Sequence, residues 1–157
     1  MEYFIHLLQR HSYIYSVVKQ PGTDILAGFF LAHPNTKSMI RLFPQVVLMD
    51  ATYKTNLYDM PLVEVIGILP TGQNYHIAFI FVSDEKTSSY VWGLTQLRVL
   101  FTECGVLPGV YRELVAMRAI EEVFPEAAHL LCRRHISKDV HKYVSNMMGV
   151  RKSMNVQ

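Results

Sequence analysis

Val46-Val47-Leu48-Met49-Asp50-Ala51-Thr52-Tyr53-Lys54-Thr55-Asn56 is the stretch that decides the fold, because an apolar run ends in it at a carboxylate followed by polar residues. The four residues before Asp50 are continuously hydrophobic, which is typical of a strand covered on both faces. Pro44 marks a boundary that a helix does not cross. We therefore predict a buried strand that ends at Asp50 and presents its carboxylate to a site. An Asp here is also compatible with an ordinary turn or helix-cap residue.

Length and composition limit the class of protein. The chain has 157 residues, half of them hydrophobic, which is enough for one domain with a hydrophobic core. The formal net charge of +2 is too small to indicate a nucleic-acid surface by itself. Cys104 and Cys132 form no disulfide framework, and the first residues lack the pattern of a signal peptide. With no apolar stretch near the ~18 residues of a membrane span, we expect an intracellular globular protein.

Three regions are expected along the chain: an N-terminal lead-in of residues 1–44, a main domain of residues 45–148 and a polar tail of residues 149–157. Periodic patterns in the lead-in predict a helix over Glu2–Gln20, a strand over Ile25–Leu31 and a short helix over Thr36–Phe43.

The main domain continues after the Asp50 strand with alternating elements. Two strands, Pro61–Leu69 and Tyr75–Val82, are separated by turn-forming residues and predict a hairpin. The following elements are a helix that ends at Gly105, a strand of barely three residues between Val106 and Val110, a helix over Arg112–Val123, a strand over Ala127–Cys132 and a helix over Ile136–Met148.

This order predicts an α/β domain of mixed α+β composition, with a ribonuclease-H-like fold: a mixed sheet that contains an antiparallel three-strand meander and has flanking helices. Such a sheet places the ends of its first and fourth strands side by side. Phosphoryl transfer at that place requires several carboxylates, because two divalent cations must be held close together. Asp50 alone cannot hold two metal ions.

A set of short motifs resembles, in order, the catalytic domain of Mutator-like element (MULE) transposases. These motifs are Met49–Asn56, Met60–Leu62, Gly67, Tyr90–Leu94, Arg112–Leu114 with Ala119–Ile120, Val123–Ala127 and Cys132–Ile136. No single motif is decisive, but the ordered set is specific and extends from about Ile25 to about Val140. The ribonuclease-H-like fold of that family agrees with the order of elements predicted from the residues.

The resemblance implies a DDE-type DNA transposase, which uses two Asp, one Glu and Mg²⁺ or Mn²⁺ to cleave DNA ends and join them to target DNA. Asp50 matches the first acid and would be a metal ligand. Val110 and Tyr111 stand where family members carry Thr-Asp, so the second acid is absent. The third acid lies beyond the end of this chain in relatives. The implied partners are transposon ends and target DNA, with a homo-oligomer or an intact transposase subunit, and the implied location is the nucleus.

Other acids do not replace the missing ones in this interpretation. Glu113 is nearest, but it falls inside a predicted helix. The three remaining candidates are expected to be solvated charges: Asp59, Asp84 and Asp139.

Cys132 and His135 match the family's Cys-x-x-His signature. Thiolate and imidazole at this spacing can share one zinc ion, but a structural zinc site needs four ligands and the other cysteine is remote. A packed strand-end Cys and a polar His are therefore preferred to zinc. Four basic residues could face a DNA backbone or form a solvated surface: Lys54, Arg133, Arg134 and Lys138.

The sequence thus predicts a MULE transposase domain that is catalytically impaired. The alternatives are a non-catalytic DNA- or protein-binding module domesticated from a transposase, and an enzyme that is active through an intact partner subunit.

Overall fold

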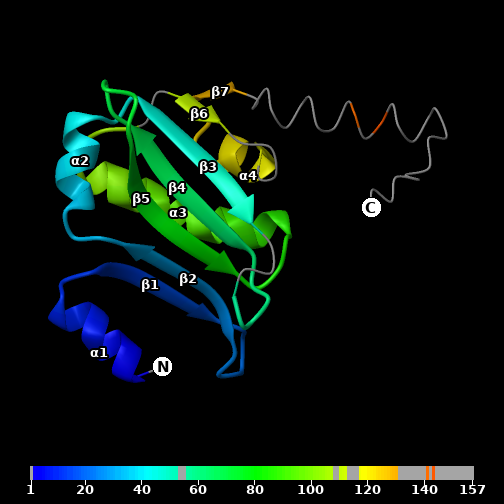
Figure 1. The fold of residues 1–157 in the computed structure, drawn as a ribbon. Helices are drawn as coiled ribbons and strands as arrows, with labels where there is room; N and C mark the ends of the chain where they lie inside the picture. Colours follow the sequence, from blue (N-terminus) through cyan, green and yellow to red (C-terminus); the bar gives the residue numbers. More distant parts are fainter. Residues whose placement is uncertain are drawn as a thin grey trace, which may run out of the picture.

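The computed structural model describes residues 2–52, 56–107, 110–112 and 117–130, together with residues 141 and 143. These ranges contain α1 (Glu2–Arg10), β1 (Ile14–Lys19), β2 (Leu26–Ala32), α2 (Thr36–Leu42), β3 (Val46–Thr52), β4 (Leu62–Ile68), β5 (Asn74–Val82), α3 (Thr87–Glu103), β6 (Val110–Arg112), α4 (Met117–Val123) and β7 (Ala128–Leu130). The strands form one sheet in the order β1-β2-β5-β4-β3-β6-β7 (Figure 1). Adjacent strands in the series β1-β2-β5-β4-β3 are antiparallel. The last two strands, β6 and β7, run parallel to β3. The predicted mixed α/β architecture is confirmed.

The first twenty residues differ from the predicted single helix. α1 ends at Arg10, and the chain reverses near Ser12, whose φ of 55° lies in the left-handed region. The residues that follow include Ile14 and Val17, and β-branched side chains favour strands. β1 then pairs with β2 along its whole length. Because this pairing satisfies the backbone groups of β1, it overrides the helical spacing of the apolar residues.

β3, β4 and β5 form the predicted antiparallel meander. The register of β4 on both neighbours is continuous except for one irregularity next to Val65. The turn between β4 and β5 contains Gly72, whose φ of 80° is available to glycine without steric cost. Local turn residues and strand patterns therefore sufficed to predict this part of the sheet.

β3 is covered on one face, not on both as its apolar run predicted. Val47 and Met49 are buried, whereas Val46 and Leu48 are only partly buried. The strand also continues beyond Asp50 to Thr52. An apolar run cannot distinguish the two cases, because the burial of its second face depends on what packs there.

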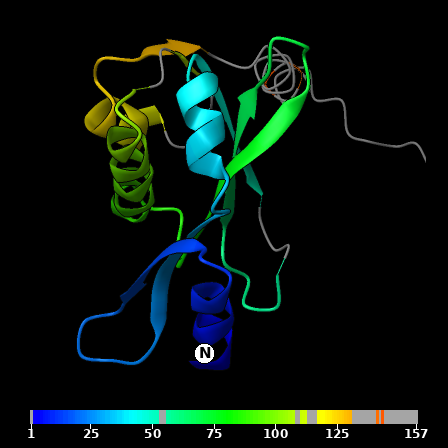
Figure 2. The ribbon, with the colours of Figure 1, turned by 90° about the vertical axis from the view of Figure 1, so that its left-hand side faces the viewer.

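α3 lies against one face of the sheet and forms the core with it, and α4 packs on α3 (Figure 2). The apolar side chains that α3 directs toward the sheet are buried: Tyr90, Leu94, Leu97 and Phe101. Gly93 allows α3 to lie close to β5, because a Cβ at this position would lie 2.3 Å from a methyl carbon of Ile80. Gly105 follows the helix with a φ of 73°, as expected for a residue that ends a helix. Trp92 is partly buried and packs against the core.

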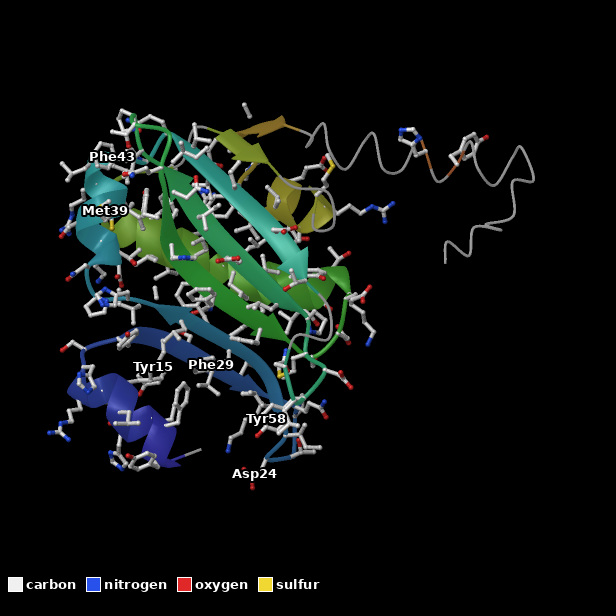
Figure 3. The ribbon with its side chains drawn as sticks, in the orientation of Figure 1. Tyr15, Asp24, Phe29, Met39, Phe43 and Tyr58 are labelled. Carbon is white, nitrogen blue, oxygen red and sulfur yellow. The ribbon has the colours of Figure 1, made fainter. Side chains whose placement is uncertain are left out.

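α1 lies on the opposite side of the sheet, which we call the open face. Successive strand residues point to opposite faces, so Phe29 faces away from Phe30, which is in the core. The Phe29 ring contacts Phe4 of α1 and Phe81 of β5, with centroid distances of 5.7 and 6.4 Å. Figure 3 shows Phe29 on the strands beside α1.

β6 is as short as predicted but occurs later in the chain, at Val110–Arg112 instead of Val106–Val110. Its pairing with β3 begins after Pro108, which has no N–H to donate to a ladder. Arg112, predicted to begin a helix, is therefore a strand residue, and α4 is described from Met117.

The last elements are described only in part. β7 falls within the predicted strand Ala127–Cys132 and pairs in parallel with β6. Apart from His141 and Tyr143, the predicted helix Ile136–Met148 lies outside the described residues. None of the helices described here has the length and apolar character that crossing a membrane requires.

Candidate functional site

Asp50 is held on the open face of the sheet by β3. Val47 and Met49 of the same strand point into the core, so alternation directs Asp50 to the other side, where it is exposed. The strand itself is fixed between β4 and β6. The carboxylate therefore sits on a rigid element and is accessible to a ligand.

Glu64 stands directly opposite Asp50 on β4. Opposed residues on antiparallel strands have Cβ atoms about 5 Å apart, so the two carboxylates belong to one surface. Glu64 is not among the site residues predicted from the sequence. Two signals could have found it: a lone carboxylate between the apolar residues of a predicted strand, and the register that a short hairpin imposes on its neighbours.

His76 adjoins this pair from β5. Its Nδ1 atom lies 2.9 Å from Glu64 Oε1, and its ring stacks on Phe79 with a centroid distance of 5.3 Å. The side chains of His76 and Glu64 are 63% and 39% exposed, so this contact contributes little to stability. We call Asp50, Glu64, His76 and Phe79 the Asp50 patch.

β6 lies on the other side of β3 and includes Tyr111, where the resemblance places the second acid. Tyr111 is in register with Val47, and Arg112 with Leu48. The described part of β6 therefore stops two residues before the level of Asp50. Where the resemblance places the second Asp, this strand has a Tyr, which does not supply an anionic oxygen ligand at neutral pH.

The metal ions implied by the resemblance can be tested against the donors present. Mg²⁺ and Mn²⁺ need several hard oxygen ligands. Within the described ranges, no group of three or more His, Cys, Asp or Glu side chains could hold a metal ion. Asp50 and Glu64 offer two carboxylates, and Glu64 already contacts His76. These donors do not fit a two-metal centre, and no catalytic step through metal ions follows from them.

Several residues singled out from the sequence lie outside the described part of the chain. These are Lys54, Glu113, Cys132, Arg133, Arg134, His135, Lys138 and Asp139. Their predicted roles in the family signature, in DNA contact and in zinc binding stay predictions.

Asp59 and Asp84 are described and lie away from the patch. Asp59 is exposed in the β3–β4 connection, as predicted for a solvated charge. Asp84 differs from that prediction, because it accepts hydrogen bonds from Lys86 N and Ser89 Oγ at the start of α3. The side-chain hydrogen bonds from Lys86 and Ser89 hold the pKa of Asp84 at about 2.

Two buried or partly buried groups near α2 are held neutral. Burial raises the pKa of Tyr75 to about 12, and its hydroxyl donates a hydrogen bond to Phe43 O at 2.9 Å. Burial also raises the pKa of the Cys104 thiol, whose Sγ lies 3.7 Å from Lys37 O. A neutral, buried thiol is a poor nucleophile, so Cys104 is a packing residue.

Comparison with a known family fits this arrangement. The model of the MULE transposase domain matches residues 46–139, which is more than half of the chain. The chain belongs to the MULE transposase domain family. The matched region begins at β3 and includes all four residues of the Asp50 patch.

Two relatives of this MULE domain are much longer than the chain. Protein FAR1-RELATED SEQUENCE 5 of Arabidopsis thaliana is 30% identical over 138 residues, covering 87% of this chain and 17% of the relative. The PKS-NRPS hybrid synthetase cheA of Chaetomium globosum is 31% identical over 105 residues, covering 63% of this chain and 2% of the relative. The MULE domain described here thus spans less than a fifth of either relative.

Proposed function

We propose that this MULE domain interacts with DNA and does not, as a single chain, cut and join DNA ends. The family relation supports an interaction with DNA. The second part is supported by the identity of one residue of β6: where the resemblance places the second Asp, the strand has Tyr111, which is in register with Val47 of β3. Without the second acid of the family, most of the stabilisation that two metal ions give to phosphoryl transfer would be lost.

We also infer that the sheet is of the ribonuclease-H-like type. The antiparallel meander of β3, β4 and β5 is followed by α3, β6, α4 and β7, and both later strands are parallel to β3. This order supports descent from a nuclease-like scaffold. The Asp50 patch would then be the remnant of the ancestral active site.

DNA binding is tested by fluorescence anisotropy with a labelled duplex of arbitrary sequence at increasing salt. Binding through phosphate contacts should weaken steeply as salt rises, because counterions are released when the complex forms. The absence of binding at low salt would contradict the proposal. Transposon ends and target DNA are the proposed natural partners, and a nuclear location, tested with a fluorescent fusion, follows from them.

Catalysis is tested with supercoiled plasmid in Mn²⁺. We expect equal, background nicking by the wild-type protein and by Asp50→Asn. Nicking by the wild type that disappears in Asp50→Asn would show a working active site and overturn the second part of the proposal.

A second candidate is a protein-binding module that joins an intact transposase subunit. It is favoured by an apolar groove of about 500 Å³ on the open face, between α1 and the β3–β4 connection. Its rim includes Tyr58, which is 79% exposed. Sedimentation with an intact MULE transposase subunit should show a complex that Tyr58→Ser weakens, whereas independent sedimentation would reject this candidate.

A further inference from the structure

A second cavity, of about 360 Å³, lies where β2 and β5 separate. The pairing of these strands ends at Leu31 opposite Phe79. Beyond that pair the chain leaves β2 through His33 and enters α2, while β5 continues back toward its start. Met39, which Figure 3 labels on α2, is one of the residues that line the cavity.

Aromatic rings form much of the lining. From the β1–β2 side, Tyr13 and His33 are in edge contact, with ring centroids 5.3 Å apart. From the β5 side, the stacked rings of His76 and Phe79 line the cavity. Planar, mostly apolar walls of this kind suit a flat aromatic ligand.

The polar groups of the lining are uncharged or imidazole. Among the described residues that line the cavity, none is Lys, Arg, Asp or Glu. Thr36, which is only 3% exposed, and Asn35 add neutral hydrogen-bonding groups. An isolated phosphate or metal ion would find no opposite charge here, whereas a neutral heterocycle would find hydrogen-bonding groups and ring faces.

The two imidazoles offer opposite hydrogen-bonding properties. His33 Nδ1 accepts a hydrogen bond from Asn35 N at 3.1 Å, so neutral His33 carries its proton on Nε2 and can donate. His76 Nδ1 faces a carboxylate oxygen of Glu64, which only accepts, so neutral His76 has an accepting Nε2. One donor and one acceptor are what the hydrogen-bonding edge of a nucleobase requires.

The cavity is continuous with the Asp50 patch, because His76 and Phe79 belong to both. A ligand seated in it would therefore lie beside the Asp50 patch, which the proposed function treats as the remnant of the ancestral active site. We propose that this cavity binds a nucleobase of an unpaired DNA strand. This inference rests on the proposed DNA interaction and adds a site to it.

The test compares two labelled strands of twelve nucleotides by fluorescence anisotropy, one of thymidines and one entirely abasic. Both carry the same phosphates, so only the bases differ. We expect the wild type to bind the thymidine strand at least about 5-fold more tightly, as base stacking on aromatic side chains predicts.

Two variants should remove this preference. Tyr13→Ser deletes a ring of the lining, and Met39→Trp fills the cavity without deleting one. The matched control is Tyr3→Ser, which removes a 78% exposed aromatic residue of α1 that does not line the cavity and should keep the preference. Thermal melting monitored by circular dichroism verifies that each variant is folded, and Met39→Trp keeps the test decisive if Tyr13→Ser unfolds.

The outcomes separate this inference from the proposed function. Duplex binding with equal affinity for the two strands would overturn the nucleobase site and leave the DNA interaction standing. A failure to bind any DNA would overturn both. Thymidine is the probe for a free nucleoside. If thymidine shifts the imidazole NMR signals of His33 and His76 while neither strand binds, the ligand of the cavity is a free nucleoside and the proposal of a DNA base is wrong.

Discussion

Asp50 and Glu64 face each other across β3 and β4, and both lie on the open face of the sheet. Like charges directly opposite each other destabilise a strand pair. We expect Asp50→Asn to raise the free energy of unfolding by about 0.2–1 kcal/mol in the absence of divalent ions. Urea denaturation at pH 7 measures this difference. As a control, Glu85→Gln removes an exposed carboxylate near α3 and should change the free energy of unfolding less. A loss of stability in Asp50→Asn would contradict the expected repulsion.

Divalent metal ions should change the melting temperatures of the wild type and of Asp50→Asn by the same amount. A ligand that binds only the folded state raises its stability, so a working metal site would raise the melting temperature of the wild type. Because the described donors do not fit a two-metal centre, we expect millimolar Mn²⁺ to shift the wild type and Asp50→Asn equally. A shift confined to the wild type would show that Asp50 still binds a cation.

Gly67 and Tyr75 form a close contact that should tolerate no added side chain. A Cβ at Gly67 would lie 2.3 Å from two carbons of the Tyr75 ring, whose hydroxyl also donates to Phe43 O. We expect Gly67→Ala to destabilise the fold by about 1–3 kcal/mol, as overpacking does. In a Tyr75→Ala background the same change should cost much less. Equal costs in the two backgrounds, measured by urea denaturation, would show that the ring is not the obstacle.

Arg98 connects α3 to the end of α4. Its guanidinium donates to Val123 O, pairs with Glu126 at 2.8 Å and lies over the Phe124 ring. Arg98→Met keeps the apolar stem but loses these contacts, and we expect it to lower the free energy of unfolding by about 1.5–3 kcal/mol. Glu126→Gln removes only the partly exposed ion pair and should cost less than about 1 kcal/mol. Equal losses would mean that the bond to the Val123 carbonyl contributes nothing.

Asp84 should make the start of α3 sensitive to acid. Its folded-state pKa of about 2 lies below the ordinary value of 3.8, so its contribution is complete above pH 4 and is lost as the pH falls through about 2. At pH 7 we expect Asp84→Asn to cost about 0.5–1 kcal/mol, because a partly exposed pair is screened by solvent. The difference from the wild type should shrink between pH 4 and pH 2 in denaturant titrations. A difference that is constant with pH would assign the effect to neutral hydrogen bonding.

The sequence by itself determined the local elements around Asp50. The hairpin of β4 and β5, the helix α3 and the shortness of β6 follow from turn residues, side-chain periodicity and the proline before Val110. These signals act between residues close in the chain, so they can be recognised without the fold. The family motifs were equally visible, as was the Tyr at the position where the resemblance places the second acid.

Only the tertiary structure decided which groups meet. The residues of β1 form a strand because they hydrogen-bond to β2, although the apolar residues of this segment repeat at helical spacing. Glu64 and His76 joined Asp50 because strand register brings together residues that are distant in the chain, and Arg98 met Val123 through the packing of two helices. Such contacts depend on long-range pairing and on which face of an element is covered, and the local pattern of side chains does not encode either.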